Sequence, residues 1–256
     1  MHSLHRLASR ATRLRRFSAP ADVARALEEA RGADLAKRAE LAGSLSSSWE
    51  ACELGEAQTL ADGAGAVHTF ALRSRCGVEL ASVRAAIFGA GGNADVATAL
   101  MFGPACDPAL PLALAARPLV AHAIGVATAA HGAERIAAVA RLPGLCAWIV
   151  ATRAWDGLDA AELGDDAAGA VEAVARGVPR PGHSVLGQGT FAAAQPAFER
   201  LATRFAEERL ATDADAEVGA FLSAGAELVG VHWMHDKSPP ALRDSGGCTA
   251  SFQWPE

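Results

Sequence analysis

Three short apolar runs follow one another in the first half of this chain, with turn residues between them and little room for a helix. They cover residues 67–72, 83–88 and 96–102. Strands joined by short turns pair antiparallel, whereas two parallel strands need a crossover of about a dozen residues or more. The spacing therefore predicts an antiparallel meander and disfavours repeated β-α-β units.

Helical spacing dominates on both sides of these runs. The segments with apolar residues three or four positions apart are 21–45, 158–177, 198–205 and 214–233. Two further apolar runs, 119–127 and 145–151, are interpreted as a fourth and a fifth strand, and residues 46–64 as a loop. We therefore expect an α+β fold, a single-domain α/β/α sandwich in which helices cover a central antiparallel sheet.

Composition narrows the class of protein. Hydrophobic residues make up 51% of the 256 residues and charged residues 20%, which excludes a wholly disordered chain. No stretch of eighteen apolar residues is free of charges or helix breakers, so no membrane span is predicted. A formal net charge of -6 disfavours nucleic acid as a partner, because nucleic-acid-binding domains carry a basic face.

The spacing of the cysteines does not indicate a disulfide framework. There are five of them, an odd number, widely scattered and without a C-x-x-C pair. Neither a set of disulfides nor a zinc knuckle is expected from such a pattern. A reducing compartment fits it best.

The first twenty residues differ from the rest of the chain. They contain five arginines and no acidic residue. An arginine-rich, acid-poor and amphipathic N-terminus is typical of an organelle transit peptide, and Arg15-Arg16-Phe17-Ser18 resembles a mitochondrial processing site. We predict that residues 1–20 are a transit peptide and that residues 21–256 form one domain. The alternative is a basic N-terminus without a targeting signal.

A glycine-rich segment follows the second apolar run. From Gly89 to Ala94 the chain matches the pattern G-x-G-x-x-A. After a strand and before a helix, such a loop lets backbone N–H groups approach the pyrophosphate of a nicotinamide dinucleotide. A glycine turn between two antiparallel strands explains the same residues. Both interpretations stay open at this point.

The densest group of polar residues lies near the C-terminus, in the segment His232-Trp233-Met234-His235-Asp236-Lys237. Two histidines three positions apart on a helix could ligate zinc, but no third ligand is near, and no metal is expected. A helix end with solvated polar groups is the simplest interpretation. A third is proton transfer, with the carboxylate of Asp236 orienting the imidazole of His235. Glu79, between Val78 and Leu80, is a candidate buried carboxylate.

Several patches, taken in order, resemble a known family. Residues 75–83 read RCGVELASV, residues 95–102 read DVATALMF, and His235-Asp236-Lys237-Ser238 precedes Leu242. Across residues 68–247 these patches resemble the ferredoxin-dependent bilin reductases. The resemblance implies an α/β/α sandwich with an antiparallel central sheet, in agreement with the fold expected from the apolar runs.

The resemblance also implies a reaction. A linear tetrapyrrole of the biliverdin type would be reduced by sequential electron and proton transfer, with reduced ferredoxin as the electron donor and no bound flavin, nicotinamide or metal. The residues that the resemblance assigns to catalysis are Asp236, His235 and Glu79, and those it assigns to bilin binding are Lys237, Thr98 and Arg75.

Two other functions stay open. One is a non-catalytic tetrapyrrole-binding protein on the same fold, and the other is an NAD(P)-dependent oxidoreductase that uses the loop from Gly89 to Ala94. The expected location is an organelle matrix. The family favours the plastid stroma, whereas the N-terminal segment favours the mitochondrion.

Overall fold

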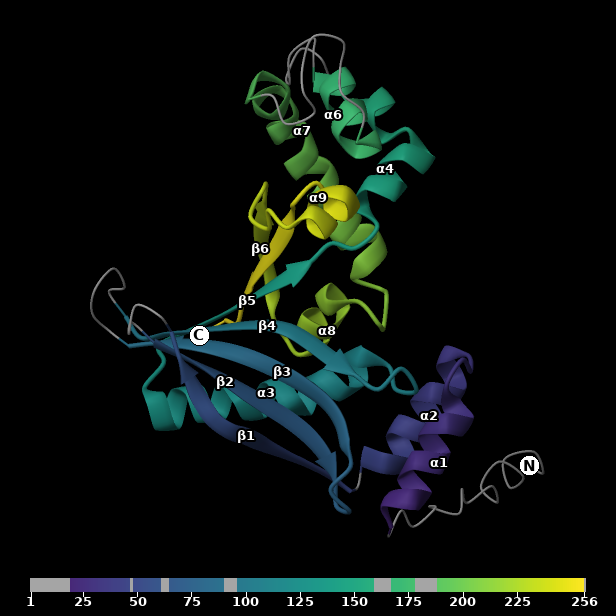
Figure 1. Ribbon diagram of the computed structural model, residues 1–256, viewed down its shortest axis with the longest axis vertical. Coiled ribbons are helices and arrows are strands. Elements are labelled where there is room, and N and C mark those ends of the chain that lie inside the picture. Colours follow the sequence, from purple (N-terminus) through teal and green to yellow (C-terminus); the bar gives the residue numbers. More distant parts are fainter. Residues whose placement is uncertain are drawn as a thin grey trace, which may run out of the picture.

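A mixed sheet of seven strands runs through the part of the chain that the structure describes (Figure 1). This computed structural model describes residues 19–46, 48–60, 65–89, 96–158, 167–177 and 188–255. The strands are β1 Trp49–Thr59, β2 Gly65–Ser74, β3 Glu79–Phe88, β4 Thr98–Cys106, β5 Arg135–Arg141, β6 Glu227–His232 and β7 Thr249–Gln253. Their order across the sheet is β1-β2-β3-β4-β5-β7-β6.

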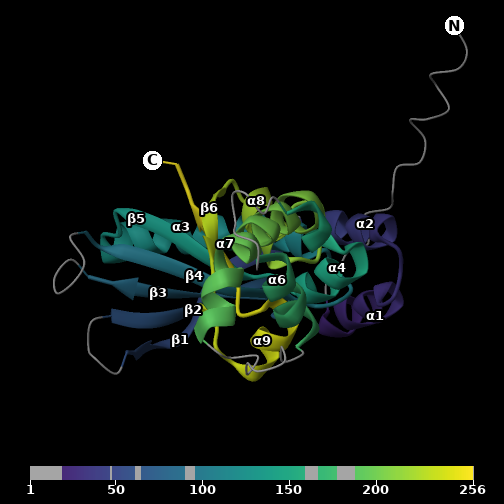
Figure 2. The ribbon, with the colours of Figure 1, turned by 90° about the horizontal axis from the view of Figure 1, so that it is seen from above.

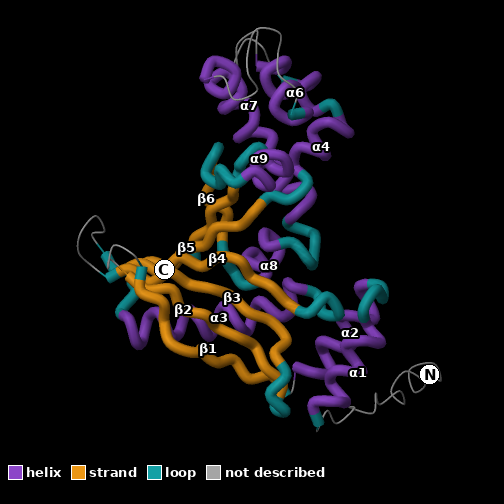
Figure 3. The backbone as a smooth tube through the Cα atoms, in the orientation of Figure 1, coloured by secondary structure: helices purple, strands orange, loops and turns teal. Residues whose placement is uncertain are grey.

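The described helices cover one face and the ends of this sheet (Figure 3). They are α1 Pro20–Ala30, α2 Leu35–Ser46, α3 Leu112–His131, α4 Leu145–Thr152, α6 Ala167–Arg176, α7 Gln188–Phe205, α8 Glu217–Ser223 and α9 Pro239–Ser245. Two short turns are η1 Ala154–Gly157 and η2 Ala206–Leu210. The predicted α+β fold with a central, largely antiparallel sheet is confirmed.

The predicted meander is present in β2 to β4, and β1, which was expected as a loop, extends it by one strand. Each of these four strands pairs antiparallel with the next. Phe70 of β2 lies opposite Val83 of β3, and both side chains are fully buried on the face that α3 covers. Alternate residues such as Arg84 point to the other face, where its guanidinium lies 4.8 Å from the ring centroid of Phe102. The two-residue period of β3 thus separates a core face from a more exposed face.

Helix α3 replaces the fourth strand expected at residues 119–127. It lies across β1 to β4 and buries Ala116, Leu119, Val120 and Ala123 against them (Figure 1). The prediction of a strand was wrong because the run belongs to a 20-residue apolar segment rich in alanine and leucine, which favour helix. Within the described residues, α3 is also the one helix long and apolar enough to cross a membrane, and its packing on the sheet accounts for that apolar character.

Three other local expectations were also wrong. Residues 145–151 form α4 instead of a fifth strand, and the expected loop at 46–64 contains the edge strand β1. The expected helix at 214–233 divides into α8 and β6. Tertiary pairing overrides weak local preference here: β1 contains Glu, Gln and Gly and becomes a strand by pairing with β2.

Helices α1 and α2 form a hairpin at one end of the strands (Figure 2). The hairpin has its own small hydrophobic cluster, in which Val23, Leu27 and Leu45 pack against Leu80 and Leu110. Arg31 of the hairpin also pairs with Asp107, just beyond β4, at 2.9 Å. The hairpin is thereby attached to the segment that joins β4 to α3.

Some expectations fall on residues outside the described ranges. Residues 1–18 of the predicted transit peptide lie outside them, so that peptide and the organelle location stay predictions. Residues 90–95 also lie outside them, although the strands on both sides of the glycine-rich loop are described.

Candidate functional site

The strand pairing in the sheet changes from antiparallel to parallel between β4 and β5. Among the described strands these two form the only parallel pair, and α3 is the crossover between them. In sheets with parallel strands, ligands bind in the crevice outside the carboxyl ends of the strands. A cavity of about 510 Å³ lies at that edge, and we call it the β4–β5 cleft. Its described lining residues are Arg38, Pro104, Ala105, Cys106, Pro108, Leu110, Leu112, Arg141, Pro143, Asp215, Ala216, Glu217 and Asp244.

Two further cavities adjoin this cleft. One of about 430 Å³ shares Arg141, Pro143 and Asp244 with it and reaches Asp236 and Thr249. The other, of about 720 Å³, shares Pro143 and is lined by Trp148 and residues of η2. The three together provide room for an elongated ligand at the carboxyl edge of β4 and β5.

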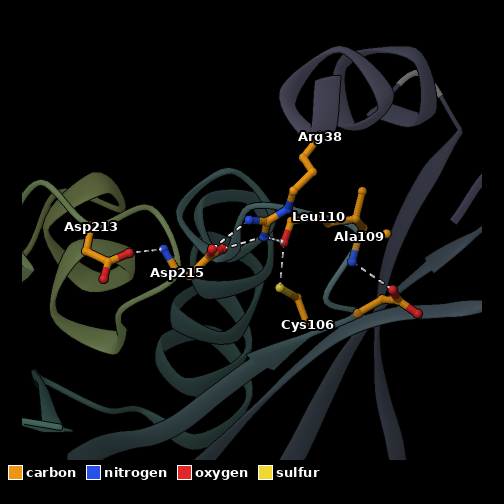
Figure 4. Close-up of polar contacts among 7 residues, drawn as sticks. Arg38, Cys106, Ala109, Leu110, Asp213 and Asp215 are labelled. Carbon is orange, nitrogen blue, oxygen red and sulfur yellow. Dashed lines mark hydrogen bonds and ion pairs between the residues drawn. The ribbon is translucent and has the colours of Figure 1, made fainter. Parts of the chain in front are cut away.

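Arg38 enters the cleft from α2, far in sequence from the strands (Figure 4). Its two terminal nitrogens donate to the two carboxylate oxygens of Asp215, each at 2.6 Å, and Nη2 also donates to the Leu110 carbonyl at 2.8 Å. The Arg38 side chain is 13% exposed, and its buried Nε has no hydrogen-bond partner among the described atoms. This parallel two-bond geometry is the strong form of an arginine–carboxylate pair.

The hydrogen bonds from Arg38 hold the pKa of the Asp215 carboxyl below its usual range. A carboxyl with a lowered folded-state pKa contributes stability above its unfolded value of about 3.9, and this contribution is lost as the pH falls through the folded value.

We therefore expect Asp215→Asn to be less stable than wild type at pH 7, by about 1 kcal/mol because Asp215 is half exposed and water screens the pair. The difference should shrink below about pH 4. Urea unfolding between pH 2.5 and pH 7 measures it. Asp22→Asn, which breaks the exposed pair with Arg25, is the control, and a difference that does not vary with pH would contradict the assignment.

A second arginine–carboxylate pair closes the other side of the cleft. The backbone N–H of Arg141 donates to Glu217 Oε2 at 2.9 Å, and its Nε and Nη2 donate to Oε1 at 2.9 and 2.6 Å. Glu217 is buried, whereas the side chain of Arg141 is 72% exposed. The buried carboxylate therefore fixes the orientation of a guanidinium that faces the cleft and the adjoining cavity.

Two histidine–hydroxyl pairs lie near Arg141. His235 Nδ1 is 3.0 Å from the hydroxyl of Thr249, and His232 Nε2 is 2.9 Å from that of Ser251. Thr249 lies opposite Arg141 in the β5–β7 pairing and lines the 430 Å³ cavity. The search of the described residues finds no group of three or more His, Cys, Asp or Glu suited to a metal ion. Each imidazole is thus placed to exchange protons with a hydroxyl.

Asp236 caps the next turn of the chain. Its carboxylate accepts a hydrogen bond from the Ser238 backbone N–H at 2.9 Å, and bonds of this kind lower its pKa. Asp236 is therefore ionised at neutral pH, and it holds the turn before α9, whose N-cap is Ser238. This geometry favours a structural role for Asp236 over proton donation.

Cys106 ends β4 at the wall of the cleft. Burial raises the pKa of its thiol to about 11, and the thiol donates to the Leu110 carbonyl at 3.2 Å. The thiolate is the nucleophilic form of cysteine. At neutral pH Cys106 is therefore a protonated wall residue and a poor nucleophile.

The structure separates the other residues expected at the site. Glu79 is exposed at the start of β3 and lines a small hollow beside Asp107. Arg75 is exposed in the turn between β2 and β3, and Lys237 is exposed next to Asp236. Thr98 begins β4, at the opposite end of that strand from the cleft, and its hydroxyl donates to the Val96 carbonyl. Only Asp236 and its neighbour His235 lie beside the cavities at Arg141.

Four polar residues of the cleft carried no signal in the sequence: Arg38, Arg141, Asp215 and Glu217. Each stands in a stretch of ordinary helix, strand or loop composition. The pairs are separated by 177 and 76 positions, so no local spacing could indicate them. A local signal close to the cleft is Pro143-Gly144, which begins two residues after the last residue of β5 and is typical of a turn.

The placement of β3 and β4 argues against a dinucleotide site at Gly89 to Ala94. The two strands pair antiparallel at Phe88 and Thr98, and residues 90–95 between them lie outside the described ranges. The described residues from 96 onward lead into β4 and not into a helix, whereas a pyrophosphate-binding segment opens a helix whose N-terminus faces the phosphates. The interpretation as an NAD(P)-dependent oxidoreductase was therefore wrong.

Comparison with known proteins gives one clear likeness, in the fold. No family model and no curated protein matches the sequence. Malonyl-CoA decarboxylase from Rhodopseudomonas palustris superposes with a TM-score of 0.61 and 15% identity over 91% of this chain and 64% of its own length. Malonyl-CoA decarboxylase from Cupriavidus metallidurans gives 0.55 and 14% over 85% and 64%. The chain spans a little under two thirds of each neighbour, and the likeness shows a shared fold.

These neighbours belong to a different family from the bilin reductases. The resemblance to bilin reductases was therefore wrong, and with it the oxidoreductase activity, the use of ferredoxin and the binding of a tetrapyrrole. The patches that suggested it are a few residues long. Two of them are parts of β3 and β4, and alternating apolar residues in strands recur in unrelated sheets.

Proposed function

We propose that this chain binds a coenzyme A thioester in the β4–β5 cleft and decarboxylates a malonyl-type acyl group. The observation that carries this proposal is the cleft itself, at the parted carboxyl ends of the parallel pair and lined by two arginines. Its volume lies within the range of about 300–1,000 Å³ that is typical of small-molecule sites. The shared fold with two malonyl-CoA decarboxylases supports the choice of ligand.

The two arginines of the cleft suit the ligand's anionic groups. A malonyl thioester has phosphates at one end and a carboxylate at the other, and arginine pairs with both kinds of group through two parallel hydrogen bonds. Arg38 and Arg141 both line the cavity, one from α2 and the other from the end of β5. We assign Arg38 to the phosphate end and Arg141 to the acyl end, because Arg141 also lines the cavity that contains Thr249.

The reaction breaks the bond between the carboxylate and the adjacent carbon. Carbon dioxide leaves, the electron pair forms an enolate on the thioester, and that carbon then takes up one proton. Arg141 is held in place by the buried Glu217, so it can stabilise the developing oxyanion without reorganising. His235, paired with Thr249, is the proposed proton source.

The test is incubation of the protein with malonyl-CoA, with mass spectrometry of the product. We expect malonyl-CoA to be converted into an equal amount of acetyl-CoA. Arg141→Gln should lower kcat by about 10²-fold or more, the usual effect of losing one donor to a developing oxyanion. Arg135→Gln, at the opposite end of β5, is the matched control and should leave kcat unchanged.

Three results would count against the proposal. If wild type forms no acetyl-CoA but still binds CoA in calorimetry, the proposed decarboxylation is wrong and the proposed ligand stands. If wild type neither binds CoA nor forms acetyl-CoA, both the reaction and the ligand are wrong. Equal loss of activity in Arg135→Gln and Arg141→Gln would contradict the placement of the site.

A further inference from the structure

The described walls of the β4–β5 cleft carry more negative than positive charge. Its walls carry two arginines, Arg38 and Arg141, and three carboxylates, Asp215, Glu217 and Asp244. Each arginine already forms two short bonds to its own carboxylate. A ligand with several phosphates would meet a net negative wall, and like charges at close range repel. Binding therefore requires that one carboxylate give up its arginine.

The two pairs differ in how readily they can open. Glu217 is 8% exposed and accepts three hydrogen bonds from Arg141, so its release would leave a buried carboxylate without partners. Asp215 is 49% exposed and can turn its carboxylate into water. Asp215 is the one that can leave at low cost.

Arg38 stays in position when Asp215 leaves. Its Nη2 is also bonded to the Leu110 carbonyl at 2.8 Å, and its side chain is only 13% exposed. When Asp215 leaves, the two terminal nitrogens that donate to it can donate to another acceptor. The arginine is thus held by the fold, while the half-exposed carboxylate of Asp215 is held by the arginine and by the Leu112 backbone N–H.

We propose that Asp215 occupies the place of a ligand phosphate in the empty cleft, and that a phosphate of the bound thioester exchanges with it on Arg38. This inference rests on the proposed function. It makes α2 part of the binding site, because this helix supplies the cation that the phosphate meets. The exchange keeps the charge on Arg38 balanced both with and without ligand.

The test compares two variants that break the same pair from opposite sides, with CoA as the calorimetric probe. Asp215→Asn removes the competing charge and should tighten CoA binding about tenfold. Arg38→Gln removes the phosphate's partner and should weaken it about tenfold or more. Asp22→Asn, which loses an equal charge from an exposed pair on α1, should leave CoA affinity unchanged. If the pair only held the hairpin in place, both variants at the site would shift affinity in the same direction, which would overturn the exchange.

Inorganic pyrophosphate separates this inference from the proposed function. Tighter pyrophosphate binding by Asp215→Asn than by wild type, in a protein that does not consume malonyl-CoA, supports the exchange and overturns the decarboxylation. Wild type that consumes malonyl-CoA, with equal CoA and pyrophosphate affinities in wild type and Asp215→Asn, overturns the exchange and supports the decarboxylation. Unchanged circular dichroism and cooperative thermal unfolding well above the assay temperature would show that the weaker binding of Arg38→Gln is not caused by unfolding.

Discussion

Phe221→Ala is expected to lower the free energy of unfolding by about 3–5 kcal/mol, the usual cost of truncating a buried phenylalanine. Phe221 is fully buried in α8, with its ring centroid 5.7 Å from that of Phe252 and 6.0 Å from that of Trp254. These rings join α8 to the end of β7. Alanine would leave a cavity there that the rigid sheet cannot close, and aromatic contacts would be lost as well.

Urea unfolding followed by circular dichroism measures this effect. Phe221→Leu keeps most of the volume and should cost less than about 1.5 kcal/mol. Leu35→Ala is the control, because Leu35 is 51% exposed on α2 and should change stability by no more than about 0.5 kcal/mol. Similar losses for Leu35→Ala and Phe221→Ala would contradict the placement of Phe221 in the core.

Gly219→Ala is expected to destabilise the protein by about 1–3 kcal/mol, although alanine normally favours a helix over glycine by about 1 kcal/mol. Gly219 lies in α8, where an added Cβ would overlap the carbonyl oxygen of Asp213 and lie 3.1 Å from that of Leu210. Both obstacles are backbone atoms, so they cannot move aside by a side-chain rotation. The segment that must shift carries Asp215, so the Arg38 pair should weaken too.

Gly43→Ala is expected to change the free energy of unfolding in the opposite direction and to stabilise the protein. Gly43 lies in α2, and an added Cβ would meet no described atom within 4 Å. Here the helix preference should act alone and raise stability by up to about 1 kcal/mol. Thermal unfolding of the two variants measured side by side checks the pair of predictions. The close packing at Gly219 is refuted if both substitutions stabilise the protein.

Much of the sheet could be predicted from the sequence. The runs at 67–72, 83–88 and 96–102 form β2, β3 and β4, because a short connection leaves an antiparallel hairpin as the simplest pairing. The apolar runs at 119–127 and 145–151 could not be assigned by period, because a segment that is apolar on all sides shows none. Both are helices that the core surrounds only in part.

The site was less accessible to sequence reasoning. The polar segment at His235 and Asp236 was singled out from the sequence as unusual, and it lies beside the cavities at Arg141. The chemistry attached to it through the bilin reductases was wrong, because short motifs repeat by chance in alternating strands. Arg38 and Asp215 could not have been paired in advance, since a contact across 177 positions depends on how the hairpin packs.

By itself the sequence determined the fold class, the antiparallel pairing of β2 to β4 and the amphipathic helices, because period and connection length act over a few residues. The parallel step from β4 to β5, the helical state of α3 and the meeting of Arg38, Arg141, Asp215 and Glu217 were decided by tertiary structure alone. These features arise when apolar surfaces distant in sequence pack together. Polar groups that the packing brings into one cleft must then pair with one another, since an isolated buried charge is too costly.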